Sequence, residues 1–114
     1  MMMKELRPWG SYEILLDSDA CKVKRITVSP GEKLSYQYHY KRSEVWTFVS
    51  GAGILTLEDE DMPVCEGSVV QIAKEQKHRV YNDGPFDLVF VEVQLGSYFG
   101  EDDIVRLEDS YGRV

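Results

Sequence analysis

The sequence alternates short apolar runs with turn residues, and this pattern constrains the fold more than any other feature. The runs are rich in Val, Ile, Tyr and Phe, which favour β-strands, and no apolar pattern with a period of 3.6 residues lasts for the roughly 10 residues of a helix. The pattern therefore predicts an all-β protein. The expected strands are Tyr12–Leu16, Cys21–Val28, Leu34–Tyr40, Val45–Ser50, Gly53–Leu57, Met62–Cys65, Ser68–Ile72, His78–Tyr81 and Leu88–Leu95.

Turn residues separate the expected strands at close intervals. They are concentrated at Ser29–Gly31, Ser50–Gly53 and Asn82–Pro85. Many short strands at such spacing indicate a sandwich or a closed barrel, because these folds protect sheet edges by closure or by packing two sheets together. With 114 residues, the chain has the length of one domain and can still bury a sizeable core.

Two expected strands are apolar at nearly every position. Val45–Val49 and Leu88–Val91 offer apolar side chains to both faces of a sheet. Such strands are covered on both sides, either within an oligomer or under a second layer of strands, and the first alternative predicts a homodimer. Trp46, Phe48 and Phe90 are expected in the core rather than on a sugar-stacking surface.

The charge balance argues against nucleic acid as a partner. The chain has 13 Lys and Arg residues against 20 Asp and Glu residues, a formal net charge of −7, whereas nucleic-acid binders normally carry a basic excess or patch. No apolar run approaches the roughly 18 residues of a membrane helix, and the start of the chain lacks the apolar core of a signal peptide. These features predict a soluble, cytoplasmic protein, in which Cys21 and Cys65 are expected to be buried free thiols.

Two histidines, a carboxylate and an amide form the most informative polar pattern. Gln37 and His39 are two residues apart in an expected strand, so they project from the same face. The residues that follow allow a tight turn, which places Glu44 at the start of the neighbouring antiparallel strand, and His78 opens a later strand. Imidazole, carboxylate and amide oxygen together suit a divalent cation, so these four residues are predicted to bind a metal.

The spacing of these residues resembles the two sequence motifs of the cupin superfamily. The resemblance implies a single cupin domain over residues 1–114, which is a double-stranded β-helix or jelly-roll barrel. We expect an N-terminal arm over residues 1–20, the barrel core over 21–95 and a C-terminal tail over 96–114. The first motif matches Gly31, Gln37, His39, Glu44 and Gly51, with Gln37 in place of the usual histidine, and the second matches Gly67, Ala73, Glu75, His78 and Asn82 less closely.

Beyond these motifs, nearly the whole chain resembles the cupin domain of type II mannose-6-phosphate isomerases. The resemblance is carried by Arg7–Glu13, Lys22–Val28, Gly96–Asp109 and Tyr111–Arg113. It implies a metal-dependent isomerase of the mannose-6-phosphate/fructose-6-phosphate type, with zinc as the expected metal and manganese, nickel or iron as alternatives. The usual second domain of these enzymes is a mannose-1-phosphate guanylyltransferase. This chain is too short to contain one, so a separate guanylyltransferase chain is a candidate partner.

The implied reaction moves a proton between neighbouring carbons through a cis-enediol. It needs an electrophile at the carbonyl oxygen, a base that works near pH 7 and a cation for the distant phosphate. A metal can be the electrophile. Lys41 and Glu92 are the candidates for the base.

Basic residues are the candidates for binding the phosphate of such a substrate. The resemblance implies a functional arginine at Arg106 in the tail, which is the predicted catalytic residue. Arg25, Lys41 and Arg42 are predicted to bind substrate, and Lys24 is a further candidate. Lys24 and Arg25 project from opposite faces of one strand, so at most one of them points into the barrel.

The sequence departs from the isomerase pattern at three positions. Tyr40, Lys41 and Val45 stand where the family usually carries additional histidines. If one of those histidines were the proton-transfer base, this chain would lack it. The departure favours a second hypothesis, a non-catalytic cupin that binds a carbohydrate or sugar nucleotide. A third hypothesis is another metal-dependent cupin enzyme such as an oxygenase. Gln37 argues against it, because iron–oxygen chemistry more often uses three histidines.

Overall fold

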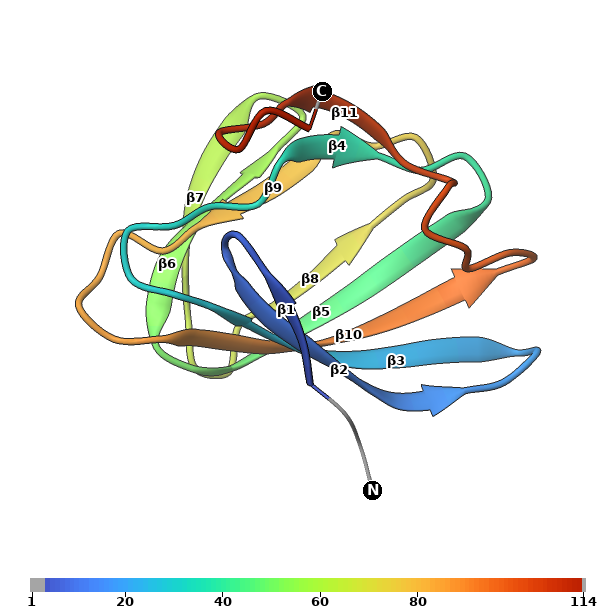
Figure 1. The fold of residues 1–114 in the computed structure, drawn as a ribbon, viewed down its shortest axis with the longest axis horizontal. Helices are drawn as coiled ribbons and strands as arrows, with labels where there is room; N and C mark the ends of the chain where they lie inside the picture. The colour runs from blue at the N-terminus through green and yellow to red at the C-terminus, as the bar shows by residue number, and fades with distance from the viewer. Residues whose placement is uncertain (1–3, 114) are drawn as a thin grey trace.

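The structure is a computed structural model that describes residues 4–113, and these residues form two antiparallel β-sheets (Figure 1). The larger sheet has the strand order β1-β2-β3-β10-β5-β8, and the smaller has the order β11-β4-β9-β6-β7. In Figure 1 the larger sheet runs along the bottom and the smaller lies above it. The strands are β1 (Lys4–Arg7), β2 (Gly10–Asp17), β3 (Cys21–Val28), β4 (Tyr36–Tyr38), β5 (Arg42–Ser50), β6 (Ala52–Leu57), β7 (Glu60–Cys65), β8 (Val69–Ile72), β9 (His78–Tyr81), β10 (Leu88–Gly96) and β11 (Val105–Glu108).

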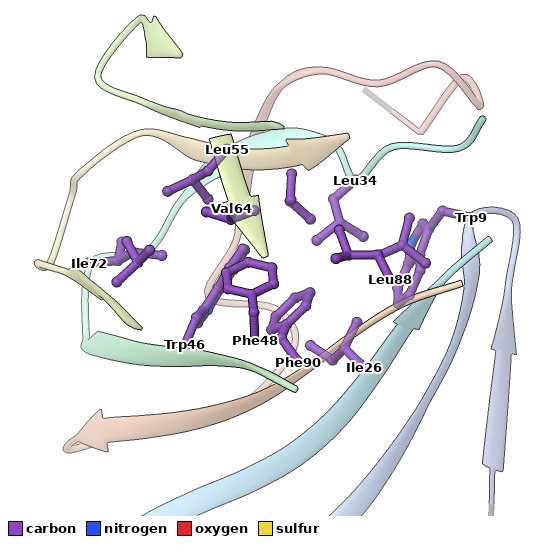
Figure 2. Close-up of a cluster of buried hydrophobic side chains, with 13 residues drawn as sticks. Trp9, Ile26, Leu34, Trp46, Phe48, Leu55, Val64, Ile72, Leu88 and Phe90 are labelled. Atoms are coloured by element: carbon purple, nitrogen blue, oxygen red, sulfur yellow. The ribbon is translucent and has the colours of Figure 1, made fainter. Parts of the chain in front are cut away.

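The apolar core lies between the two sheets (Figure 2). Successive residues of β5 and β10 alternate between buried and half-buried positions, as expected for strands with one face toward the core. Trp46, Phe48 and Phe90 are almost fully buried, and the Trp46 and Phe90 rings stack with their centroids 4.3 Å apart. Their predicted place in the core is confirmed. Leu55 and Val64 approach them from the smaller sheet.

The N-terminal residues 4–17 form a hairpin that extends the larger sheet beyond β3. Trp9, in the turn of this hairpin, is buried in the apolar core. Gly10 has a φ of 151°, and a Cβ there would lie 2.0 Å from the carbonyl oxygen of Thr27. Only glycine therefore lets the hairpin approach β3 this closely.

The C-terminal residues 97–113 return across the smaller sheet. β11 pairs with β4, with Arg106 opposite Gln37. The Tyr111 hydroxyl donates to the Glu32 carboxylate, and this contact fixes the tail to the loop before β4. The backbone N–H and the guanidinium of Arg113 donate to the Asp109 carboxylate.

The all-β prediction is confirmed, because residues 4–113 contain strands and no helix. Among these residues no helix is long and apolar enough to cross a membrane. The expected burial of both thiols is wrong for Cys65, which is exposed because it ends β7 on the outward-facing side, and Cys21 is only partly buried. The expected strand Leu34–Tyr40 is shortened to Tyr36–Tyr38, so His39 lies just beyond β4.

Candidate functional site

Paired strands bring the predicted metal ligands into one pocket between the sheets. Glu44 lies on β5, in register with Gln94 on β10. Gln37 on β4 is in register with His78 on β9 and with Arg106 on β11. Because directly paired residues project from the same face of a sheet, each row of side chains points inward together.

His39, Glu44 and His78 form a buried cluster with the composition of a metal site. One donor atom from each residue lies within 4.8 Å of the donors of the other two. His39 Nε2 is 3.3 Å from Glu44 Oε2, and His78 Nε2 is 3.7 Å from Glu44 Oε1. Two imidazole nitrogens and a carboxylate oxygen suit a divalent transition metal.

Backbone carbonyls fix the tautomers of both histidines. His39 Nδ1 donates to the carbonyl oxygen of Asp103 at 2.7 Å, and His78 Nδ1 donates to that of Gln76 at 2.8 Å. A carbonyl oxygen can only accept, so each Nδ1 carries the hydrogen and each Nε2 directs its lone pair toward Glu44. Burial lowers the pKa of both imidazoles to about 4, so both are neutral near pH 7. The cluster therefore fits a metal in both tautomer and charge.

The Glu44 carboxylate is oriented by two neighbours. Trp46 Nε1 donates to Oε1 at 2.9 Å, and Arg42 Nε donates to Oε2 at 2.7 Å. Arg42 is buried, and its Nη2 also lies 3.2 Å from His39 Nε2. This hydrogen bond uses the lone pair that a metal would use. A metal bound by all three residues therefore requires Arg42 to release His39.

Arg42 also presents an unused donor to the pocket. Its Nη1 is buried and has no hydrogen-bond partner among residues 4–113. A buried guanidinium donor without a partner is costly unless a ligand or water satisfies it. Arg42, predicted from the sequence to bind substrate, thus lies where it can donate to an oxygen of a bound molecule.

A second buried carboxylate lies beside the cluster. Glu92 faces into the pocket from β10, and its Oε1 accepts a hydrogen bond from Gln94 Nε2 at 2.6 Å. Burial, followed by the negative charge of Glu44, raises the pKa of Glu92 to about 7. Lys24, buried on the paired strand β3, forms an ion pair with Glu101 in the tail.

Most of the residues predicted for the site line this one pocket. The structure does not bring Arg25 or Lys41 to it. Arg25 is exposed and pairs with Glu13 at 2.6 Å, while Lys41 is exposed over the ring of Tyr98. Lys24 is the inward-pointing member of the Lys24–Arg25 pair, as its position in the pocket shows. The predicted residues that do line the pocket are Lys24, Gln37, His39, Arg42, Glu44, His78, Glu92 and Arg106.

The three positions at which the resemblance implies additional histidines point away from the pocket. Tyr40 is exposed, with its hydroxyl 3.1 Å from that of Tyr38. Val45 projects from the opposite face of β5 to Glu44. Tyr40, Lys41 and Val45 are all absent from the pocket lining. Their replacement therefore leaves the described pocket intact.

Sequence reasoning missed Asp103, Arg7 and Arg113. Asp103 is buried and holds the loop that carries His39. Its carboxylate accepts from the backbone N–H groups of Tyr40 at 3.1 Å and Lys41 at 2.9 Å. Arg7 and Arg113 line the pocket from the two ends of the chain. Both arginines belong to segments that carry the family resemblance, Arg7–Glu13 and Tyr111–Arg113. No spacing rule, however, predicted that they line the pocket.

The pocket is partly open to solvent, and the cavity within it measures about 140 Å³. The His/Glu/His cluster lies inside a two-sheet barrel, which is the arrangement of the cupin double-stranded β-helix. A solved Klebsiella pneumoniae protein with a double-stranded β-helix domain shares this fold, with a TM-score of 0.76 and 20% identity over 85% of this chain and 83% of that one.

The chain belongs to the mannose-6-phosphate isomerase C-terminal family, whose model matches residues 1–109. It is 47% identical over 111 residues to the xanthan biosynthesis protein XanB of Xanthomonas campestris, covering 97% of this chain and 24% of that protein. It is 45% identical over 107 residues to a mannose-1-phosphate guanylyltransferase of Salmonella montevideo, covering 94% of this chain and 23% of that protein. The chain thus spans about a quarter of the length of these relatives.

Proposed function

We propose that the protein is a metal-dependent sugar-phosphate isomerase that interconverts an aldose and a ketose of the mannose-6-phosphate/fructose-6-phosphate type. The observation that carries this proposal is the composition of the pocket. It combines two neutral imidazoles and a carboxylate with a second buried carboxylate and a guanidinium donor that has no partner. Membership of the mannose-6-phosphate isomerase C-terminal family supports the same reaction.

His39, Glu44 and His78 would hold the metal, with Gln37 beside His78 in register. We propose zinc, and manganese, nickel and iron also suit this donor set. When bound, the metal supplies Lewis-acid polarisation of the substrate's carbonyl oxygen. The hydrogen bonds from the two Nδ1 atoms to backbone carbonyls hold the rings in place for that role.

The protein's own groups account for the proton transfer. Glu92 is the base in this proposal, because it lines the pocket, whereas the other candidate, Lys41, does not. Its carboxylate takes the proton from C2 of the aldose and returns it to C1 of the enediol, while a proton passes from O2 to O1. A pKa of about 7 for Glu92 suits both directions of this transfer. Arg42 Nη1 donates to a substrate oxygen and so satisfies its own buried N–H.

The test is conversion of mannose 6-phosphate to fructose 6-phosphate by purified protein reconstituted with each metal. Glu44→Ala should abolish turnover, because it removes a predicted metal ligand. Glu66→Ala is the control, because Glu66 is exposed and outside the pocket. A folded, metal-loaded protein without turnover would refute the isomerase proposal.

A non-catalytic cupin that binds a carbohydrate or sugar nucleotide is the second candidate function. The hydrogen bonds of Arg42 favour it, because Arg42 donates to two of the three predicted metal donors. One relative is named a mannose-1-phosphate guanylyltransferase. In this case the partner would be a separate guanylyltransferase chain, and co-purification with such a protein would test it. An oxygenase-type cupin would show bound iron and a visible absorption spectrum.

The homodimer, the cytoplasmic location and the absence of nucleic-acid and membrane partners stay predictions. The outer faces of β5 and β10 carry half-buried valines such as Val45 and Val91, which a second copy of the chain would cover. Sedimentation analysis would measure the oligomeric state directly.

A further inference from the structure

The two buried carboxylates of the pocket are held by different donors. Glu44 accepts from Trp46 Nε1 at 2.9 Å and from Arg42 Nε at 2.7 Å, so both of its oxygens are engaged. Glu92 accepts one N–H hydrogen bond in the described part of the chain, from Gln94 Nε2 to Oε1 at 2.6 Å. Gln94 is therefore the residue whose N–H fixes the Glu92 carboxylate.

No cation among the described residues shares this task with Gln94. Lys24 lies opposite Glu92 in the β3–β10 pair, but its Nζ forms an ion pair with Glu101 in the tail. The last torsion of a glutamate side chain has a broad distribution, so a carboxylate turns easily unless a hydrogen bond holds it. The orientation of Glu92 therefore depends on its neighbour two residues along β10.

Packing does not explain why a glutamine occupies this position. Gln94 is fully buried, and its Oε1 has no hydrogen-bond partner among residues 4–113. An amide oxygen without a partner is costly to bury, whereas an apolar side chain would avoid that cost. Gln94 does not line the pocket, so it does not contact a ligand there. Any effect of Gln94 on the chemistry of the site is therefore exerted through Glu92.

We propose that Gln94 is a positioning residue, which holds Glu92 so that Oε2 is the oxygen presented to the pocket for proton transfer. That Glu92 transfers a proton rests on the proposed function, whereas the hydrogen bond that orients its carboxylate does not. Glu92 is 5% exposed and lines the pocket, while its Oε1 is occupied by the Gln94 amide. The remaining oxygen is the one that can approach a bound molecule.

A fixed carboxylate oxygen suits a proton transfer between neighbouring carbons. In the proposed reaction, Oε2 takes the hydrogen from C2 while O1 gains a proton, and the C2–H electron pair enters the double bond of the enediol. The Oε2–H bond then breaks as C1–H forms and O2 loses its proton, so atoms and charge balance. An oxygen held over one face of the enediol reaches both carbons, whereas a turning carboxylate spends time in orientations that reach neither.

The kinetic test uses Gln94→Met, which removes the donor and keeps a side chain of similar length. It should lower kcat by about 10- to 100-fold, because small displacements of a reacting group have effects of this size. It should leave KM and metal affinity unchanged, because Gln94 lies outside the pocket lining. Gln71→Met, on an exposed position of β8, is the matched control. Melting curves would confirm that each variant folds.

A double variant separates positioning from a merely structural hydrogen bond. Glu92→Gln/Gln94→Glu keeps one amide beside one carboxylate, but it moves the carboxylate to the position that does not line the pocket. This variant should fold and show no turnover. Turnover near that of the wild type would overturn the proposal, because the pair would then act only as a structural contact.

NMR of the side-chain amides tests the hydrogen bond without any turnover. The chain has four glutamines and one asparagine, so these signals are few, and Gln94→Met identifies the signals of Gln94. In the wild type, one Nε2 hydrogen of Gln94 should be shifted downfield and exchange slowly with D2O. Glu92→Met leaves no acceptor and should abolish both properties.

The two readouts separate failure of this proposal from failure of the isomerase proposal. A lower kcat with unchanged KM in Gln94→Met, together with amide signals that depend on Glu92, supports the positioning role. Equal kcat in Gln94→Met and the wild type overturns it and leaves the isomerase proposal standing. Amide signals that are identical in the wild type and Glu92→Met overturn it whatever the turnover assay shows. If the signals depend on Glu92 but mannose 6-phosphate is not converted, the isomerase proposal and the proton-transfer role both fail, and the orientation of Glu92 by Gln94 stands.

Discussion

The inward face of the larger sheet has an apolar end and a polar end. The change occurs at the same level on β3 and β10, and one inward position later on β5, where Trp46 lies opposite Glu92. At the apolar end, Phe90 lies between Ile26 and Phe48 in register. At the polar end, Glu92 lies opposite Lys24, and Gln94 lies opposite Glu44. The same strands and the same pleat therefore build a hydrophobic core and a chemical site a few residues apart.

The two ends contribute to the free energy of folding with opposite signs. Each large side chain at the apolar end contributes about 1.5–3 kcal/mol by leaving water. Glu44, Glu92 and Lys24 are buried charges or potential charges, and removing such groups from water costs several kcal/mol before their hydrogen bonds and ion pairs compensate. The apolar end therefore has to stabilise the polar end, which is typical of a functional site.

The largest expected effect on stability is at the apolar end. Phe90→Ala removes a fully buried ring that packs on Trp46 and Phe48, and it should lower the free energy of unfolding by about 3–5 kcal/mol. Urea denaturation measures this change. Phe86→Ala is the control, because Phe86 is 76% exposed and its loss should cost less than about 0.5 kcal/mol. Equal losses of stability in the two variants would contradict the assignment of Phe90 to a buried apolar end.

At the polar end, Glu92→Gln should raise stability above neutral pH and lower turnover. The folded protein keeps the Glu92 proton up to a pKa of about 7, whereas the unfolded chain releases it near its ordinary value of 4.5. The wild type therefore loses stability as the pH rises from about 4.5 to 7, and the variant should not show this loss. At pH 8 the expected gain is about 1–3 kcal/mol, since one pKa unit corresponds to about 1.4 kcal/mol. Urea denaturation over this pH range is the measurement. Identical pH profiles for the wild type and the variant would contradict the raised pKa of Glu92.

Arg42→Met should increase metal affinity by about tenfold or more. The substitution frees the Nε2 lone pair of His39 and removes a cation whose Nε lies 2.7 Å from Glu44 Oε2. Competition with a chromophoric chelator measures the affinity. Arg25→Met, on the exposed face of β3, should leave it unchanged. A fall in affinity would mean that Arg42 supports the metal by positioning Glu44.

The smallest expected effect is at the positions that lack the family's histidines. Tyr40→His, Lys41→His and Val45→His should each change turnover by no more than about twofold, because these side chains point away from the pocket. Steady-state rates of the three variants are the measurement. A tenfold gain would show that one of these positions reaches the substrate.

The sequence predicted the parts of the site that depend on local spacing. The two-residue strand period and the turn after His39 were sufficient to group Gln37, His39 and Glu44, and the choice between Lys24 and Arg25 required only knowledge of which face is inward. Asp103, Arg7 and Arg113 could not be placed in this way. Their positions depend on how the hairpin before Gly10 and the tail after β10 dock on the barrel, which is a matter of contacts between distant segments.

The hydrogen bonds of Asp103 determine how much of the chain must accompany the His39–Glu44–His78 cluster if it is transferred to another protein. Its carbonyl oxygen orients His39, and its carboxylate holds the two residues that follow His39. A truncated chain that ended at Gly96 would keep β1 to β10 but lose the carbonyl oxygen of Asp103, which sets the tautomer of the predicted ligand His39. A transferred metal-type cluster must therefore include the tail at least through Asp103, although the tail adds little to the apolar core.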